Sequence, residues 1–305
     1  MSPTRRDFLA ASSAAALAGL LGSPLRLAGW SLEQEPVFTP IRRNVGFYTM
    51  RGGTVGYLVD PGAVVVVDSQ FPDEARALLA GLNQRSGGRP VDYLINTHHH
   101  GDHVGGNVAF RGNARNVVAH AQADEFMRRP PTGQPPADQL FATTTFTEEW
   151  SADVGDERVV ARHFGPAHTG GDAIITFQRA NVAHMGDLMF HGRHPVVDGA
   201  GGARMRNWPT VLEQTVAAHD GDTVYIFGHA AAGLPVTGSG ADLLRLGDYI
   251  EAVFEHVEAQ IRAGRSRDEI LAGRDPLPGF QDYGPFPQAS ARDPLTVAYG
   301  EVTGG

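Results

Sequence analysis

The sequence predicts an α/β domain in which strands and helices alternate and stack in layers. Three observations favour this fold class. Residues 63–68 hold four consecutive Val, an apolar run typical of a buried strand. Pro72 then opens a helix with Asp73 and Glu74 in its first turn, where negative charge suits the helix dipole. Residues 91–96 form a second apolar run, so strand and helix alternate as in layered α/β folds.

The alternation extends to both sides of this unit. Residues 45–50 and 54–60 predict two strands joined by a Gly-containing turn. Shorter apolar runs predict further strands at 117–119, 159–164, 173–177, 182–184 and 223–227. Helices are expected at 72–86, 121–128 and 208–219. Residues 129–140, rich in Pro and polar groups, predict a loop that could act as a lid.

The C-terminal part has a different pattern. Between residues 241 and 263 apolar side chains recur every three or four positions, which predicts an amphipathic helix that packs on the main domain or joins an oligomer contact. The last thirty residues carry many Pro and Gly and are expected to wrap the surface. We therefore expect a main domain at 40–235 and a C-terminal helical extension and tail at 236–305.

The N-terminus predicts export. Arg5 and Arg6 precede an Ala/Leu-rich stretch at residues 10–21, which is the pattern of a twin-arginine signal. This stretch is too short and too rich in Ala for a spanning helix. We expect a signal over residues 1–28, cleavage somewhere in the region 22–35, and a protein that is periplasmic or otherwise exported.

Composition narrows the classes of partner. The net charge is −9, and all 25 basic residues are Arg without a clustered basic patch, so a nucleic-acid substrate is not expected. No apolar run in the body of the chain approaches the roughly 20 residues that span a bilayer, so membrane insertion is not expected. The chain has no Cys, which excludes disulfides and thiolate metal ligands. A small molecule is the expected substrate, and the oligomeric state stays open.

A cluster of metal-binding residue types follows the strand at 91–96. His98, His100, Asp102 and His103 lie within six residues, and imidazole and carboxylate are ligands that zinc prefers. Four such groups in a tight loop are best explained by a cation, or two, that organises them. Because side chains alternate along an extended segment, His98 and His100 point the same way, and His99 is expected to serve in packing or to support a ligand.

This cluster resembles the signature of the metallo-β-lactamase superfamily. The resemblance implies a four-layer αββα sandwich with the site at one edge of its two sheets, and three more ligands on separate loops. His168 in Gly-Pro-Ala-His-Thr-Gly-Gly-Asp, Asp187 in His-Met-Gly-Asp and His229 in Phe-Gly-His match these ligands in order and in strand-end context. The resemblance covers about residues 45 to 230.

The resemblance also implies the cofactor and its arrangement. It assigns two Zn²⁺ per chain, with iron or manganese as alternatives. His98, His100 and His168 would hold one ion, Asp102, His103 and His229 the other, and Asp187 would bridge them. A hydroxide between the ions would attack the substrate. Asp102 is in addition the expected catalytic residue, as a group that orients the hydroxide or relays its proton. Asp68 matches a family position that supports the metal loop through hydrogen bonds.

Differences within the superfamily favour one function over others. The β-lactamases that use a Cys ligand are excluded by composition, and the others generally lack the bridging Asp. We therefore expect an exported zinc-dependent hydrolase that cleaves an ester, thioester, lactone or related bond. It resembles exported zinc hydrolases associated with quinoprotein systems. The alternatives are a β-lactamase, a mononuclear iron redox enzyme such as a persulfide dioxygenase, and a non-catalytic accessory protein.

Other residues near the cluster have weaker patterns. His184, His191 and His194 flank the Asp187 strand and could line the mouth of the site. Four residues could contact an anionic or aromatic substrate group, although a structural role is the simpler interpretation for each: Arg193, Arg204, Arg206 and Trp208.

Overall fold

The computed structural model describes residues 35–130 and 137–304. The export signal predicted at residues 1–28 and part of the loop predicted at 129–140 lie outside these ranges. Two large mixed sheets dominate the described residues. The first has seven strands in the order β1-β2-β3-β4-β5-β6-β7, and the second has six in the order β15-β13-β11-β10-β9-β8. A short third sheet joins β12 to β14.

The strands have the following bounds: β1 Val37–Arg42, β2 Val45–Thr49, β3 Val55–Val59, β4 Val64–Val67, β5 Val91–Asn96, β6 Ala114–His120, β7 Thr144–Phe146, β8 Glu149–Val154, β9 Glu157–Arg162, β10 Ile174–Phe177, β11 Val182–His184, β12 Phe190–His191, β13 Val224–Ile226, β14 His229–Ala230 and β15 Thr237–Gly238. The α-helices are α2 Pro72–Ser86, α3 Gly101–Val104, α4 Ala121–Arg128, α5 Trp208–Ala217, α6 Gly240–Arg262, α7 Arg267–Leu271 and α8 Pro294–Thr303. The 3₁₀ turns are η1 Gly105–Phe110, η2 Gly186–Leu188, η3 Gly199–Gly201, η4 Met205–Asn207 and η5 Gln281–Tyr283.

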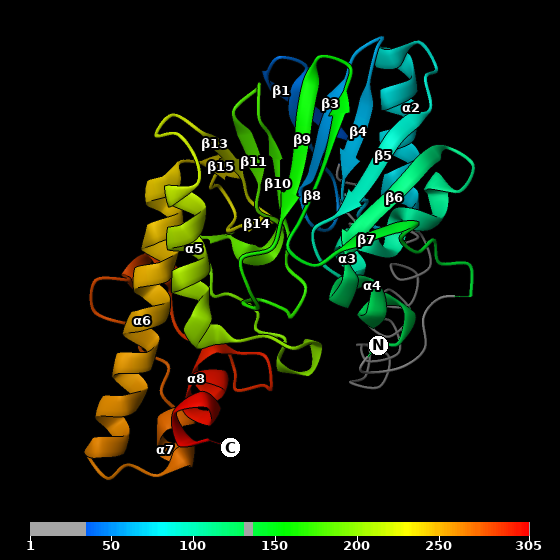
Figure 1. Cartoon of the computed structure of the whole chain (residues 1–305). Coiled ribbons are helices and arrows are strands. Elements are labelled where there is room, and N and C mark those ends of the chain that lie inside the picture. The colour runs from blue at the N-terminus through cyan, green and yellow to red at the C-terminus, as the bar shows by residue number, and fades with distance from the viewer. Residues whose placement is uncertain (1–34, 131–136, 305) are drawn as a thin grey trace, which may run out of the picture. The chain divides into compact units, whose positions relative to one another are not determined.

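The two sheets pack face to face, and helices cover their outer faces (Figure 1). The core between the sheets contains alternate residues of β4, β5 and β9 to β11, such as Val65, Ile95 and Ile175. The α2 helix buries its Leu78 and Leu82 against the outer face of the first sheet. The α5 and α6 helices cover the second sheet around Trp208. Each fully buried Leu contributes about 2 kcal/mol of hydrophobic stabilisation. The predicted α/β sandwich with helices outside two sheets is confirmed.

Strand direction brings distant segments to one edge. The β4 and β5 strands are parallel, with Val67 opposite Ile95, so the residues after both strands emerge together. In the second sheet β11 and β13 are parallel, with His184 opposite Ile226. The loops that follow β4, β5, β11 and β13 therefore meet at the same edge of the sandwich, and the loop between β9 and β10 ends there too.

The C-terminal residues differ in part from expectation. The amphipathic helix predicted at 241–263 is α6, which begins with a capping box at Ser239 and Asp242. The last thirty residues were expected to wrap the surface, and the helix α8 forms among them. Asp293 caps α8 by accepting from the Thr296 backbone N–H, and its Leu295 is buried in the core that also holds α5 and α6. The predicted boundary at residue 235 stays a prediction.

Six strands were missing from the expectation. Four of them, β1, β7, β8 and β15, lie at the ends of the two large sheets, and β12 and β14 form the short third sheet. The apolar signal is weak at such edges because only part of each strand is buried. Among the described residues, no helix combines the length and the apolar composition that crossing a membrane requires.

Candidate metal centre

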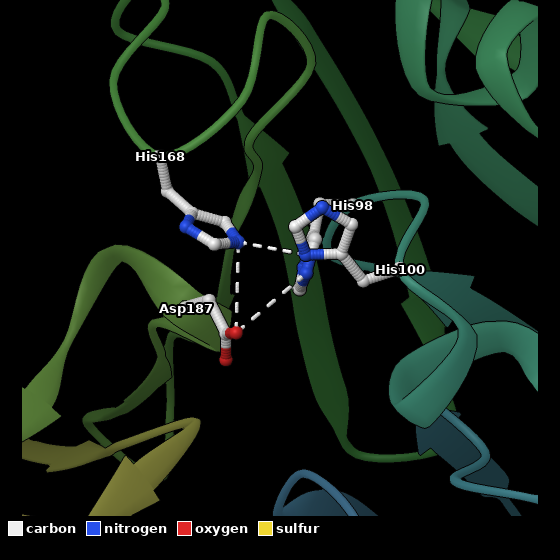
Figure 2. Close-up of side chains that lie close together, drawn as sticks. All are labelled: His98, His100, His168 and Asp187. Atoms are coloured by element: carbon white, nitrogen blue, oxygen red, sulfur yellow. Dashed lines mark hydrogen bonds and ion pairs between the residues drawn. The ribbon is translucent and has the colours of Figure 1, made fainter. Parts of the chain in front are cut away.

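The first group of predicted ligands converges near the end of β5. His98, His100, His168 and Asp187 each offer one ligand atom, and these atoms lie within 4.8 Å of one another. Figure 2 shows the three rings and the carboxylate turned toward a common point. Nε2 of His168 lies 3.5 Å and Nε2 of His98 lies 3.8 Å from Oδ2 of Asp187. Residues separated by about 90 positions in the chain thus surround one small volume.

The second group lies on the other side of Asp187. Asp102, His103 and His229 also offer ligand atoms within 4.8 Å of one another. Oδ1 of Asp187 lies 3.0 Å from Nε2 of His103 and 3.3 Å from Nε2 of His229. The two oxygens of one carboxylate therefore face different groups, Oδ2 the first and Oδ1 the second. The structure thus brings all seven predicted ligands together.

Hydrogen bonds orient the rings and leave one nitrogen of each facing inward. Nδ1 of His98 lies 3.0 Å from Oγ1 of Thr97, and Nδ1 of His168 donates to the backbone oxygen of Val196 at 2.7 Å. The inward atoms Nε2 of His98, Nε2 of His103 and Oδ1 of Asp187 are buried without a hydrogen-bond partner among the described residues. Buried polar atoms are rarely left without a partner, so this pattern fits bound cations.

The contact between His100 and His168 supports the same conclusion. Nδ1 of His100 and Nε2 of His168 face each other at 2.9 Å. The proton of His168 is on Nδ1, where Val196 accepts it, and the proton of a neutral His100 is on Nε2, 2.8 Å from Oδ2 of Asp198. Two nitrogen lone pairs then point at each other, which is unfavourable unless a cation lies between or beside them. These residues fit a divalent metal ion.

The electrostatics of the cluster also favour bound positive charge. Burial lowers the pKa of His98 well below its usual value and lowers the pKa of His168 to about 3, so both rings are neutral, as ligands must be. Burial also lowers the pKa of His103, but the Asp187 carboxylate outweighs this and raises it well above its usual value. Burial raises the pKa of Asp187, yet His229 and His103 hold it well below its usual range. Without a metal ion the ionised carboxylate has His103 and His229 as its cationic neighbours, and a bound metal ion would take that place.

Asp68 connects the end of β4 to the metal loop, the segment at residues 97–103 that holds His98, His100, Asp102 and His103. Its carboxylate accepts from the backbone N–H of Thr97 at 2.8 Å and from the Thr97 hydroxyl at 2.7 Å, and Oδ2 lies 2.7 Å from Nδ1 of His103. Asp68 adopts φ 67°, a left-handed conformation that is unusual for residues other than Gly. Strain of this kind persists where the surroundings fix it. Asp68 thus supports the metal loop, as the sequence predicted.

Two glycines permit the close approach that the centre needs. A Cβ at Gly228 would collide with Oδ1 of Asp187 and with the backbone of Gly186. A Cβ at Gly53, in the loop between β2 and β3, would collide with the ring of His103. Because neither collision involves the free end of a flexible side chain, both positions require Gly for the present packing.

Sequence reasoning missed Asp198, which follows no strand and lies in no motif. It is buried, and Oδ2 lies 2.8 Å from Nε2 of His100 and 3.3 Å from Nε2 of His99. His99, Asp198 and His100 form a third group with ligand-like geometry. A cation is disfavoured there because Nη2 of Arg292 already lies 2.8 Å from Nε2 of His100. His99 packs its ring 4.9 Å from Phe126.

The remaining histidines near the centre have structural contacts. His184 donates from Nε2 to the backbone oxygen of Thr54 and accepts at Nδ1 from the Gly186 N–H. His194 lies between the Tyr249 hydroxyl and the backbone oxygen of Pro285, and Nδ1 of His191 donates to the backbone oxygen of Pro235.

The four residues that the sequence suggested for substrate contact differ in their contacts and exposure. Arg206 is paired with Glu258, Arg204 contacts the backbone oxygen of Ala203, and Trp208 is fully buried. Arg193 is exposed and lies over the Phe190 ring, 5.8 Å from its centroid. Arg204 and Arg206 are exposed as well, so burial excludes only Trp208 from substrate contact.

Comparison with known families agrees with the fold. Residues 48–296 match the model of the metallo-β-lactamase superfamily. Among solved structures, metallo-β-lactamase IND-7 aligns with a TM-score of 0.56 and 22% identity, over 70% of this chain and 98% of that one. At this identity the likeness concerns the fold alone.

Two curated relatives match parts of the chain. The α subunit of 2,4-dinitroanisole O-demethylase from Nocardioides sp. (strain JS1661) is 29% identical over 171 residues, which are 52% of this chain and 49% of the subunit. A hydroxyacylglutathione hydrolase from Brucella anthropi is 28% identical over 150 residues, which are 49% of this chain and 52% of that protein. The matched region thus spans about half the length of these relatives.

Proposed function

Because the chain belongs to the metallo-β-lactamase superfamily, we propose that it is a metal-dependent hydrolase with two zinc ions per chain. Its substrate class is an ester, a thioester, a lactone or a related bond to a polarised carbon. His98, His100 and His168 hold one ion in this proposal. Asp102, His103 and His229 hold the other, and Asp187 bridges them.

One observation carries the proposal. The two oxygens of Asp187 divide between the two ligand groups, with Oδ2 3.5 Å from His168 and Oδ1 3.0 Å from His103. A carboxylate that served a single metal ion, or a purely structural ion pair, would not need a separate set of imidazoles around each oxygen. Paired metal sites of this kind favour attack by water on a polarised centre.

When bound, the two ions would supply an activated water and a Lewis acid for the scissile group. The residues of the chain fix where this chemistry happens. Asp68, Val196 and Asp198 hold the outward ring nitrogens of His103, His168 and His100, so each inward nitrogen is aimed before substrate arrives. No Ser or Cys nucleophile is required.

Asp102 is the proposed catalytic residue. It is more exposed than Asp187, at 30% against 5% for the side chain, and is therefore open to solvent. Burial raises its pKa, but His229 and His103 lower it below the usual value, so the carboxylate is ionised and can accept a proton or a hydrogen bond. Oδ2 lies 3.1 Å from Nε2 of His229.

The test is a panel of substrates on purified protein. A lactone, a thioester, an aryl ester, a β-lactam and 2,4-dinitroanisole would each be assayed with and without a chelator, followed by addition of Zn²⁺. The proposal expects turnover of an ester-type bond that the chelator abolishes and Zn²⁺ restores. Turnover of the β-lactam alone would replace the proposed substrate class. Inactivity on all five with two metal ions bound would refute the hydrolase assignment.

We also propose that the protein is exported. The support is Arg5-Arg6 followed by the Ala/Leu-rich stretch at residues 10–21. Replacing both arginines with Lys and measuring where the chain accumulates tests this directly. Unchanged export of the double variant would contradict the proposal.

A further inference from the structure

The C-terminal residues place a guanidinium at the edge of the metal centre. Nη2 of Arg292 lies 2.8 Å from Nε2 of His100 and 3.9 Å from Oδ2 of Asp198. The Arg292 side chain is 48% exposed, whereas those of His100 and Asp198 are 14% and 13% exposed. Arg292 therefore borders both the first ligand group and solvent.

The contact with His100 cannot be a hydrogen bond when a metal ion occupies the first group. Metal binding uses the lone pair of Nδ1, so the single proton of a neutral His100 is on Nε2. That N–H has its acceptor in Asp198, at 2.8 Å. A guanidinium only donates, so Arg292 and Nε2 of His100 are then two donors facing each other.

Asp198 does not satisfy Arg292 either. Its Oδ2 already lies close to the ring nitrogens of His99 and His100, and it is 3.9 Å from Arg292. By comparison, Arg245 has the same exposed fraction, 48%, and pairs with Asp282 at 2.7 Å. Within residues 35–130 and 137–304, Asp198 is the only carboxylate in ion-pair range of Arg292. The guanidinium thus has donors left for an acceptor from outside the chain.

The backbone holds Arg292 in place. Its carbonyl accepts from the Val197 N–H at 3.0 Å, and its N–H donates to Oγ of Ser290 at 3.3 Å. The next residue, Asp293, is buried, caps α8 and accepts from the Ser290 N–H at 2.6 Å. Hydrogen bonds to Val197 and Ser290 therefore fix the backbone at Arg292. Little backbone entropy is lost when the Arg292 side chain binds a ligand.

We propose that Arg292 binds a carboxylate of the substrate, so that this hydrolase acts on bonds whose substrate carries a negative charge near the scissile group. The inference rests on the proposed function and narrows its substrate class. A planar guanidinium matches a carboxylate through two parallel hydrogen bonds. Arg292 is thus a specificity-determining residue contributed by the C-terminal residues.

The experiment compares two acetyl esters that differ only in charge. The anionic probe is para-acetoxybenzoate and the neutral probe is its methyl ester. In Arg292→Ala, KM for the anionic probe is expected to rise about 10-fold to 100-fold, the loss of one hydrogen-bonded charge pair, while KM for the neutral probe stays within about 2-fold. Arg292→Lys should recover part of the loss. Arg245→Ala, which removes an equally exposed charge, should change neither KM.

A binding measurement separates this inference from the hydrolase proposal. Calorimetry of the metal-loaded protein with para-acetamidobenzoate, an amide with the same carboxylate, should show the same 10-fold to 100-fold weakening in Arg292→Ala, at unchanged metal content. Chelator-sensitive hydrolysis with equal effects of Arg292→Ala on both esters would overturn the inference and leave the function standing. Arg292-dependent binding without hydrolysis of either ester would do the reverse.

Discussion

Two sets of histidines in this protein differ in the partner of the second ring nitrogen. In one set, each ring donates from one nitrogen to an oxygen and accepts at the other from an N–H or O–H. This set consists of His120, His184, His194 and His219. At the metal centre the outward nitrogens of His98, His103 and His168 have oxygen partners as well. Among the described residues, the inward nitrogen of His98 has no hydrogen-bond partner, and that of His103 faces Oδ1 of Asp187.

The difference shows what makes a histidine a ligand in this fold. Burial alone does not, because His184 is as completely buried as His103. Both kinds also have one nitrogen tied to the protein. The distinguishing feature is a second nitrogen aimed at a carboxylate shared with other rings, where a metal ion can complete its contacts. Four predictions test this distinction.

The largest effect is expected from Asp187→Asn. The amide keeps the shape but removes the charge that both ligand groups share, so the second metal ion should be lost and hydrolysis should fall about 10³-fold or more. Metal analysis together with steady-state kinetics measures this. Asp156→Asn, at a residue whose side chain is 77% exposed, is the control. Two bound metal ions in Asp187→Asn would contradict the bridging role.

A smaller loss is expected from Asp68→Asn. Asn tolerates the left-handed backbone at this position as Asp does, so the strand end should keep its path. The new amide would turn an NH₂ toward Thr97 or His103, which are both donors, and the ring of His103 would lose its anchor. Metal affinity should weaken about 10-fold to 100-fold, measured by competition with a chelator. An unchanged affinity would refute the supporting role of Asp68.

His98, His100, Asp102 and His103 could be predicted from the sequence because they cluster directly after β5. His168, Asp187 and His229 were predicted through the resemblance to the superfamily, since a single residue at a strand end carries no such signal alone. Asp198 and Arg292 could not be predicted in this way, since both lie outside regular elements and reach His100 through tertiary packing. The α8 helix did have a local signal in Asp293-Pro294, a cap followed by a first-turn Pro, but the Pro- and Gly-rich flanks concealed it.

Replacing a histidine that has hydrogen bonds at both ring nitrogens should change stability and leave metal binding unchanged. His219 donates from Nδ1 to the Thr215 backbone oxygen at 2.7 Å and accepts at Nε2 from the Thr176 hydroxyl at 2.9 Å. His219→Leu removes both contacts and should lower the free energy of unfolding by about 1–2 kcal/mol. Metal content should stay at the wild-type value. Loss of metal in this variant would show that satisfied ring nitrogens do not mark structural histidines.

The last prediction concerns pH. His120 caps α4 through Nδ1, and burial lowers its pKa from 6.5 to about 4. Between these values the unfolded chain binds a proton at this position and the folded chain does not, so stability falls as pH decreases from 6.5 to 4. His120→Asn should keep the cap, because Asn accepts well at that position, and remove the titration. The slope of unfolding free energy against pH should then decrease by about 1.4 kcal/mol per pH unit in this window, measured by denaturant unfolding. An unchanged slope would mean that His120 is not kept neutral by burial, and the distinction between the two kinds of histidine would then rest on the metal centre alone.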